Sequence, residues 1–173
     1  MKRGIFIGRF QPFHNAHLSA VKWACERVDE LIIGIGSANL SLLPTNPFTA
    51  GERYEMIRGV LQADLATEIN RIHLIPIPDI FYWSCYISHV ELLVPSFQHA
   101  FEGNRSILDL FEERGYTVHL FPRFKGLSGT AIRQKILEHK QWMSEVPTEI
   151  FDFITKIRGE ERIREIYKGG NMN

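Results

Sequence analysis

The stretch GIFIGRFQPFHNAHLSAV, residues 4–21, indicates the fold class, because an apolar run gives way to a polar turn and then to a helix pattern. Residues 4–8 have the continuous apolar character of a buried strand. Gly8 lets the chain leave the sheet, and Pro12 fixes the turn that follows. The segment 17–28 then carries its apolar residues on one helical face, at Leu18, Val21, Ala24, Cys25 and Val28. A strand joined to a helix in this way predicts a βα unit of a parallel sheet.

Short apolar runs and amphipathic segments continue to alternate along the chain. Further strands are predicted at 30–36, 71–79, 98–104 and 116–122. A helix is predicted from a capping box at Thr49 and Glu52 to about residue 63. Others are predicted at 88–94, 105–114 and 128–140, and two more over 148–167. The fold class is therefore α/β, with helices on both faces of a parallel sheet.

Length and composition narrow the class of protein. At 173 residues the chain is expected to form one domain over 1–173, with a core at 4–140 and a helical tail at 141–168. Its 20 basic and 20 acidic residues balance, so neither a nucleic acid nor an anionic membrane is an expected partner, and any anion site must be local. No apolar run has the length of a signal peptide or a membrane span. Cys25 and Cys85 lie far apart without a CxxC pairing, which predicts reduced, buried thiols in a cytoplasmic protein.

The first turn carries an arrangement suited to an anion. His14 and His17 are three residues apart and are predicted to share one side of an opening helix turn, beside the positive charge of Arg9. A helix start offers free N–H groups and a favourable dipole, so imidazoles there can bind phosphate oxygens. Zinc is the alternative ligand, but no HExxH glutamate or nearby third ligand accompanies the two histidines.

A second helix start, LSGTAIR at 127–133, has complementary chemistry. Ser128 and Thr130 place hydroxyl groups at the beginning of a helix, and Arg133 follows one turn later. A Ser-Gly-Thr cap alone is common in proteins. Because both stretches follow strands of a parallel sheet, they are predicted to meet at its carboxyl edge, where such folds bind ligands.

Six ordered motifs give the sequence a specific resemblance. GRFQPFHNAHL, GIGSANLS, NPFTAGER, PIPDI, EGN and LSGTAIR occur in the order and spacing typical of archaeal-type nicotinamide-nucleotide adenylyltransferases, members of the HxGH nucleotidyltransferase superfamily. The resemblance covers roughly residues 4 to 140. It implies a Rossmann-like doubly wound five-stranded sheet of order 3-2-1-4-5. It also implies transfer of AMP from ATP to nicotinamide mononucleotide (NMN), giving NAD and pyrophosphate, and assembly into a homo-oligomer.

The resemblance also implies roles for individual residues. Catalysis would fall to His14, His17 and Arg133. Mg²⁺ would be held by the ATP phosphates and not by side chains. ATP would be bound by Gly8, Arg9, Phe10, His14, His17, Ser128, Thr130 and Arg133. NMN would be bound by Asn39, Asp79, Trp83 and Tyr86.

The sequence departs from the family pattern in two places. Ala16 stands where a glycine is usual, between the two histidines. Leu42 replaces a frequent histidine, and Thr45 or Asn46 stands where some relatives carry a basic residue. Arg53 follows this loop and is interpreted as structural, tied to Glu52 or to a helix end.

Two other functions remain open at this point. One is a related nucleotidyltransferase with another phosphorylated acceptor, such as phosphopantetheine or glycerol phosphate. The other is a sensor that binds nucleotide without turnover. The aromatic residues of the implied acceptor pocket favour a flat amide-bearing ring, and the paired histidines with Arg133 favour catalysis.

Overall fold

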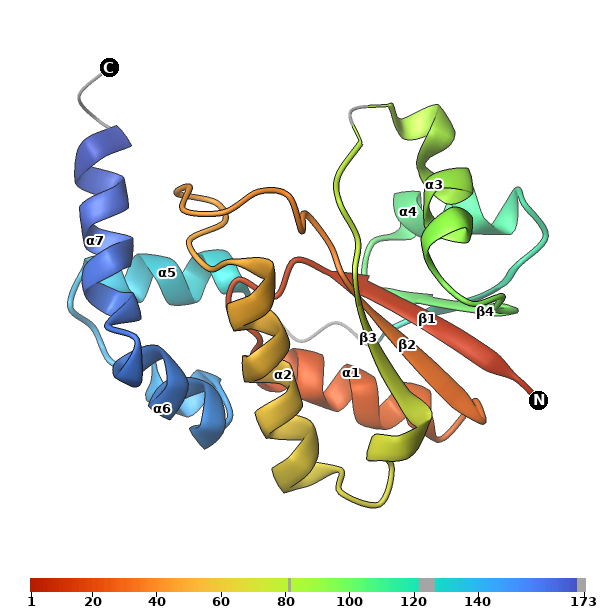
Figure 1. Ribbon diagram of the computed structural model, residues 1–173, viewed down its shortest axis with the longest axis horizontal. Coiled ribbons are helices and arrows are strands. Elements are labelled where there is room, and N and C mark those ends of the chain that lie inside the picture. The colour runs from red at the N-terminus through yellow and green to blue at the C-terminus, as the bar shows by residue number, and fades with distance from the viewer. Residues whose placement is uncertain (81, 122–126, 171–173) are drawn as a thin grey trace.

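Five parallel strands form the centre of the molecule (Figure 1). The computed structural model describes residues 1–80, 82–121 and 127–170. The strands are β1 (Arg3–Gly8), β2 (Glu30–Ile35), β3 (Ile72–Pro76), β4 (His99–Glu102) and β5 (Thr117–Leu120). Their order is β3-β2-β1-β4-β5, which confirms the predicted 3-2-1-4-5 arrangement. The order reverses beside β1, so the carboxyl end of β1 is the switch point where a ligand site is expected.

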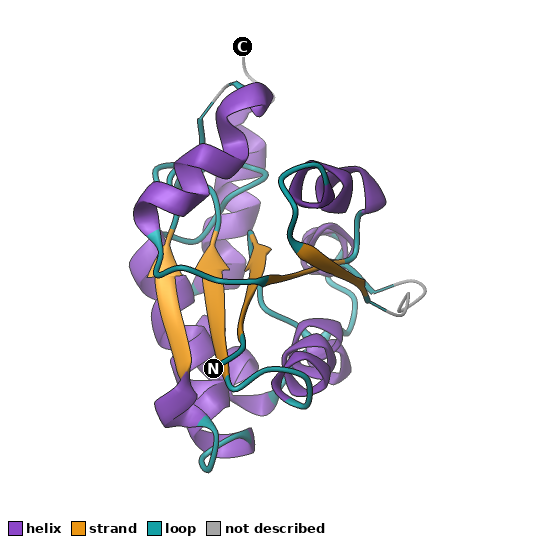
Figure 2. Cartoon of the chain, turned by 90° about the vertical axis from the view of Figure 1, so that its right-hand side faces the viewer, coloured by secondary structure: helices purple, strands orange, loops and turns teal. Residues whose placement is uncertain are grey.

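Helices cover both faces of the sheet, as a doubly wound fold requires (Figure 2). One face packs against α1 (Asn15–Cys25) and α2 (Ala50–Asp64). The other face packs against α3 (Tyr86–Leu93) and α4 (Arg105–Glu112). Strand alternation separates the two sides: Phe6 belongs to the first cluster, whereas its neighbour Ile5 belongs to the second.

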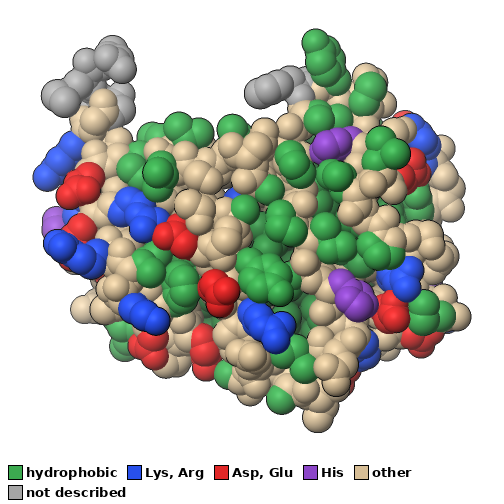
Figure 3. Space-filling model, in the orientation of Figure 1, with side chains coloured by type: hydrophobic (Ala, Val, Ile, Leu, Met, Phe, Trp, Pro, Cys, Tyr) green, Lys and Arg blue, Asp and Glu red, His purple; other side chains and the backbone are tan. Residues whose placement is uncertain are grey.

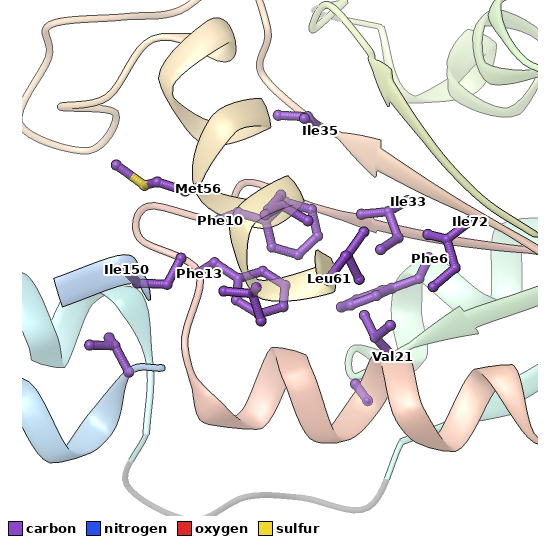
Figure 4. Packing of buried hydrophobic residues seen from close by; sticks show 14 of the residues in the cluster. Phe6, Phe10, Phe13, Val21, Ile33, Ile35, Met56, Leu61, Ile72 and Ile150 are labelled. Carbon is purple, nitrogen blue, oxygen red and sulfur yellow. The ribbon is translucent and has the colours of Figure 1, made fainter. Parts of the chain in front are cut away.

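The larger core cluster lies beneath the first turn. Figure 4 shows Phe6, Phe10 and Phe13 gathered beside Val21 of α1 and Leu61 of α2. Phe13 is fully buried and Phe10 nearly so. These aromatic residues anchor the turn between β1 and α1, so that its polar side chains are held by a packed base.

The C-terminal helices continue this core. They follow α5 (Gly129–Leu137) and comprise α6 (Thr148–Lys156) and α7 (Gly159–Gly170). Arg162 forms a salt bridge with Glu52 at 2.7 Å, and the Arg164 guanidinium donates to the carbonyl of Ile136 at 3.2 Å. The tail therefore braces the start of α2 and the end of α5. Short 3₁₀ turns, Ile69–Arg71, Trp83–Cys85 and Met143–Glu145, complete the described elements.

The sequence-based boundaries need several corrections. Helix α1 begins at Asn15 and ends at Cys25, earlier at both ends than predicted. Strand β4 spans only His99–Glu102, because the Glu102 carboxylate accepts the next two backbone N–H groups and turns the chain out of the sheet. Strand β5 likewise spans only Thr117–Leu120, and Pro122 of the predicted strand lies outside the described residues.

The two thiols differ, which is a further correction. Both cysteines are free, and Cys25 is buried, with its pKa raised to about 11 by burial. Cys85 is exposed, because it lies in the 3₁₀ turn before α3 instead of inside a core helix. None of the described helices is long and apolar enough to span a membrane. On the face shown in Figure 3, positive and negative side chains are interspersed, in keeping with the balanced composition.

Candidate active site

The turn after β1 brings the two predicted histidines into direct contact. His14 caps α1 and His17 occupies its first turn, and their rings stack with centroids 3.5 Å apart. The backbone N–H of His14 donates to Nδ1 of His17 at 3.2 Å. A neutral His17 ring therefore carries its proton on Nε2, where it can donate a hydrogen bond.

Burial keeps both imidazoles uncharged. It lowers the pKa of His14 to about 4. The pKa of His17 is also lowered well below its usual value, first by burial and then by the neighbouring His14. The rings of Phe10 and Phe13 lie against His17, at centroid distances of 4.9 and 5.3 Å. Near neutral pH the pair can therefore donate hydrogen bonds to an anion without carrying charge.

The second helix start faces this turn, as predicted. Ser128 caps α5, and its Oγ accepts the N–H of Ala131 at 3.1 Å. A Cβ added at Gly129 would lie 2.7 Å from the carbonyl oxygen of Gln11, so glycine permits the close approach of α5 to the first turn. Arg133 is only 3% exposed and donates to the same Gln11 carbonyl at 2.7 Å and to Thr130 Oγ1 at 3.3 Å. Arg133 therefore joins the two turns into one wall.

These two turns enclose a polar cavity of about 320 Å³, which we call the phosphate cavity. Its described lining includes seven of the eight residues assigned to ATP by the resemblance, and Gly8 lies outside it. Two buried polar atoms of the lining residues, Nδ1 of His14 and Nε of Arg133, have no hydrogen-bond partner among the described residues. Buried polar atoms are rarely left unpaired in proteins, so the wall of this cavity is incompletely satisfied by the described residues. The lining consists of Arg9, Phe10, Gln11, His14, His17, Leu127, Ser128, Gly129, Thr130 and Arg133.

A larger cavity of about 610 Å³ adjoins it at the carboxyl ends of β1, β2 and β4, and we call it the acceptor cavity. Arg9 lines both cavities and so marks their junction. Three of the four residues assigned to NMN line this cavity: Asp79, Trp83 and Tyr86. The ring centroids of Trp83 and Tyr86 are 5.5 Å apart, and Trp83 is 65% exposed. The remaining described lining is Ile7, Gly8, Arg9, Gly36, Ser37, Ile80, Glu102, Asn104 and Ile107.

Asn39, the fourth residue assigned to NMN, hydrogen-bonds to the backbone of Asp79, which lines the acceptor cavity. Its Oδ1 accepts the N–H of Asp79 at 2.7 Å, and its Nδ2 donates to the Asp79 carbonyl at 3.4 Å. Ser37 Oγ donates to the Asp79 carboxylate at 2.7 Å. Asn39 and Ser37 thus fix the backbone and the side chain of Asp79, whereas Asn39 itself is not among the described lining residues.

Arg53 connects the loops behind both cavities. It is fully buried, and its guanidinium donates to the carbonyls of Arg9, Gly36 and Ser37 at 2.8, 2.6 and 3.1 Å. It also donates to Thr49 at 3.2 Å, at the start of α2. Burial lowers its pKa to about 10, so it remains charged near neutral pH. A tie to a helix end was predicted, but the predicted alternative, Glu52, pairs with Arg162 instead.

Sequence reasoning assigned no role to several lining residues. Ser37, Glu102 and Asn104 lie at strand or helix ends and face the acceptor cavity. Glu102 and Asn104 belong to the EGN motif, whose position after a strand was the available signal. Ser37 has a positive φ of 50°, a conformation that sequence alone does not reveal. Ala16 is buried in the first turn of α1, between the histidines.

A zinc site was the alternative interpretation of the two histidines, and the described part of the chain contains no cluster of metal ligands. Across residues 1–80, 82–121 and 127–170, no group of three His, Cys, Asp or Glu side chains is placed to hold a metal ion. The described lining of the phosphate cavity is rich in donors and contains no carboxylate. Such a lining suits phosphate oxygens better than a bare cation.

Comparisons with known proteins agree with this geometry. The cytidylyltransferase-like family model matches residues 5–135. The nicotinamide-nucleotide adenylyltransferase of Pyrococcus furiosus is 46% identical over 166 residues, which cover 95% of this chain and 88% of that protein. The enzyme of the same name from Saccharolobus solfataricus is 44% identical, with 96% and 97% covered.

Solved structures show the same fold. A bifunctional NMN adenylyltransferase/ADP ribose pyrophosphatase from Francisella tularensis superposes with a TM-score of 0.81 at 22% identity. The structure described as its complex with AMP and a manganese ion gives 0.78 at 24% identity. Each match covers 98% of this chain and 53% of the other, so the chain spans about half the length of that bifunctional protein.

Proposed function

This chain belongs to the cytidylyltransferase-like family and is a nicotinamide-nucleotide adenylyltransferase, and we propose that its two adjoining cavities bind ATP and NMN side by side for transfer of AMP. The observation that carries the proposal is the pairing of a donor-rich cavity with an aromatic one, joined at Arg9. The products are NAD and pyrophosphate.

The phosphate cavity binds the triphosphate in this proposal. The neutral rings of His14 and His17 donate hydrogen bonds to phosphate oxygens, and Arg133 supplies a fixed positive charge. Ser128 and Thr130 add hydroxyl groups at the start of α5, where backbone N–H groups also favour an anion. These groups stabilise the negative charge that develops on the phosphate oxygens as the transferring bond breaks.

The acceptor cavity binds the nicotinamide ring of NMN. Trp83 and Tyr86 offer aromatic surfaces to a flat ring, and Asp79 offers a carboxylate held in place by Ser37. Arg9, at the junction, is placed for the NMN phosphate and the triphosphate together. A ring of this kind distinguishes NMN from phosphopantetheine and glycerol phosphate, which lack one.

The reaction is a displacement at the α-phosphorus of ATP. An oxygen of the NMN phosphate forms a bond to that phosphorus, and the bond to the pyrophosphate oxygen breaks. The NMN phosphate is already an anion, so the protein does not need to supply a base. Its contribution is alignment of the two phosphates and neutralisation of their charge.

ATP enters this scheme as its Mg²⁺ complex. The phosphate oxygens of the substrate would hold the ion, in keeping with a donor-rich cavity whose described lining has no carboxylate. When bound, it withdraws charge from the phosphates. We also propose a cytoplasmic location, supported by two cysteines that are not joined in a disulfide.

An acceptor panel tests the proposal. The protein is incubated with ATP, Mg²⁺ and, in separate reactions, NMN, phosphopantetheine and glycerol phosphate, and pyrophosphate release is measured. We expect pyrophosphate release only in the reaction that contains NMN, together with an equal amount of NAD. Reaction with another acceptor and not with NMN would make the chain a different nucleotidyltransferase. Binding of ATP without turnover on any acceptor would support the sensor function instead.

A further inference from the structure

The acceptor cavity contains a carboxylate to which neither the sequence motifs nor the proposed mechanism assigns a task. Glu102 is the last residue of β4, and alternation along this strand places it on the same face as Ala100, towards α3 and α4. It lines the cavity together with Asp79, Trp83 and Tyr86.

We propose that Glu102 is a specificity-determining residue, which makes the site select a pyridine nucleotide bearing a neutral carboxamide over one bearing a carboxylate. The proposal rests on the proposed function, since it takes the acceptor cavity to be the NMN site. NMN has a cationic ring and an uncharged amide whose NH₂ group can donate to a carboxylate. Nicotinate mononucleotide has the same ring with a negative carboxylate at that position, which Glu102 would repel.

The Glu102 carboxylate is held in a fixed position. One oxygen, Oε1, accepts the backbone N–H groups of Gly103 at 2.7 Å and Asn104 at 3.3 Å. This bonding restricts the side chain to the turn that follows β4. A fixed charge discriminates between ligands better than a mobile one, because it cannot move away from an unfavourable partner.

The surroundings give this charge little compensation. The other titratable or charged groups lining the cavity are Asp79 after β3, Tyr86 of α3, and Arg9 after β1. Arg9 lies at the junction with the phosphate cavity, where the substrate phosphates require it. Arg105, at the start of α4, is engaged by Asp109 and Glu112. Among the described residues, the charged side chains around Trp83 and Tyr86 in this cavity are therefore the carboxylates of Asp79 and Glu102.

The pKa values of Glu102 and Tyr86 are both shifted in the direction expected of an acidic, desolvated cavity. Burial raises the pKa of Glu102 to about 7, despite the two N–H groups that favour its charged form. The pKa of the Tyr86 phenol is raised by burial and then by the charges of Glu102 and Asp79. The carboxylates of Glu102 and Asp79 therefore both act on the Tyr86 phenol. Glu102 changes its charge near neutral pH.

The selectivity should follow this change of charge. Above pH 7 Glu102 is ionised and repels the nicotinate carboxylate; below pH 7 it becomes neutral and the repulsion is lost. Nicotinate mononucleotide keeps its carboxylate charged throughout this range. Both acceptors carry the same phosphate and react with the same ATP. The effect of pH on these shared groups therefore cancels in the ratio of the two kcat/KM values.

The experiment compares Glu102→Gln with the wild-type chain. The glutamine keeps the shape of the side chain and an oxygen for the Gly103 and Asn104 N–H groups. The matched control is Glu113→Gln, at an exposed residue beyond the end of α4. For each protein, kcat/KM is measured with NMN and with nicotinate mononucleotide at pH 6 and pH 8, and thermal unfolding confirms that the variants are folded.

We expect the wild-type preference for NMN to be about tenfold greater at pH 8 than at pH 6. Glu102→Gln should lower the preference at pH 8 by a similar factor and remove its pH dependence, whereas Glu113→Gln should match the wild type. An unchanged preference in Glu102→Gln, with NMN still used, would overturn the specificity role alone. Failure of the wild-type chain to use either nucleotide would overturn the proposed function as well.

Discussion

The phosphate cavity and the acceptor cavity are built in opposite ways. The first is formed by two helix starts whose polar side chains hydrogen-bond to backbone groups of the first turn and rest on buried phenylalanines. The second gathers residues from several strand ends, loops and helices, and Trp83, one of its lining residues, is largely exposed. A reacting triphosphate needs fixed donors, and a ring-binding site needs surface and selectivity. The two halves should therefore respond differently to substitution.

The largest effect is expected from His17→Ala. Loss of a fixed donor beside the transferring phosphate should lower kcat by about 10²- to 10³-fold, with a smaller effect on ATP binding. Steady-state kinetics with calorimetric ATP binding would measure both. His139→Asn, at an exposed residue with φ of 53°, is the control and should leave kcat unchanged. A normal rate in His17→Ala would remove this residue from the catalytic set.

Arg53→Met should affect both cavities together through stability. The substitution leaves the carbonyls of Arg9, Gly36 and Ser37 without their buried donor, so we expect a loss of about 3 kcal/mol in the free energy of unfolding. Urea denaturation would measure it. Arg58→Met, at an exposed position of the same helix, should cost little. Equal stability of the two variants would contradict the view that Arg53 ties the loops together.

Arg133→Lys tests the joint between the two helix starts. Lysine keeps the charge but lacks the planar fork that bonds Gln11 and Thr130, so kcat/KM for ATP should fall by about 10- to 100-fold. Initial rates at varied ATP would show the loss. Arg105→Lys, a surface substitution, should behave as the wild type. Full activity of Arg133→Lys would mean that charge alone suffices.

Trp83→Ala should weaken the acceptor side selectively. Loss of the aromatic surface should raise KM for NMN about tenfold while leaving KM for ATP unchanged. The neighbouring Tyr82 is 74% exposed and is not among the described lining residues, so Tyr82→Ala is the matched control. A parallel rise in both KM values would contradict the separation of the cavities.

The smallest effect is a pH dependence of stability on the phosphate side. The pKa of His14 is lowered to about 4 in the folded chain, so between about pH 6.5 and 4 the unfolded chain binds the proton first. Stability should therefore fall as the pH falls through this window. Urea denaturation at pH 7 and pH 4 should show a loss about 1–3 kcal/mol larger in the wild type than in His14→Asn.

Asparagine retains a helix cap at this position. The raised pKa of Glu102 has the opposite effect, because its protonation makes the folded protein more stable as the pH falls. Glu102 is present in both proteins, so its contribution cancels when their losses of stability are compared. Equal losses in the two proteins would contradict the buried, neutral state of His14.

The two cavities also differ in how far the sequence predicted them. The placement of both histidines at one helix start and the Ser128 cap follow from local patterns, because each depends on a few consecutive residues, whereas the strand order was implied by the family resemblance. The acceptor cavity depends on long-range placement: Ser37, Glu102 and Asn104 meet only because the sheet brings their strand ends together. Their roles could not be read from a local pattern.

The boundary errors have similar causes. Strand β4 ends early because the Glu102 side chain competes for backbone N–H groups, which hydrophobic periodicity does not register. Cys85 is exposed because its segment forms a 3₁₀ turn at the edge of the acceptor cavity. Arg53 was identified as structural, but its carbonyl partners come from both preceding loops and were not predictable from the residues beside it.

The most direct test of the account is the stereochemistry at the transferring phosphorus. In the proposed mechanism both substrates are bound together, NMN attacks ATP directly, and the histidines serve only as hydrogen-bond donors. Adenosine 5′-triphosphate with one α-phosphate oxygen replaced by sulfur, in a single configuration, is reacted with NMN, and the configuration of the product is determined. A single displacement predicts inversion; retention would reveal two displacements through a covalent intermediate and would contradict the account.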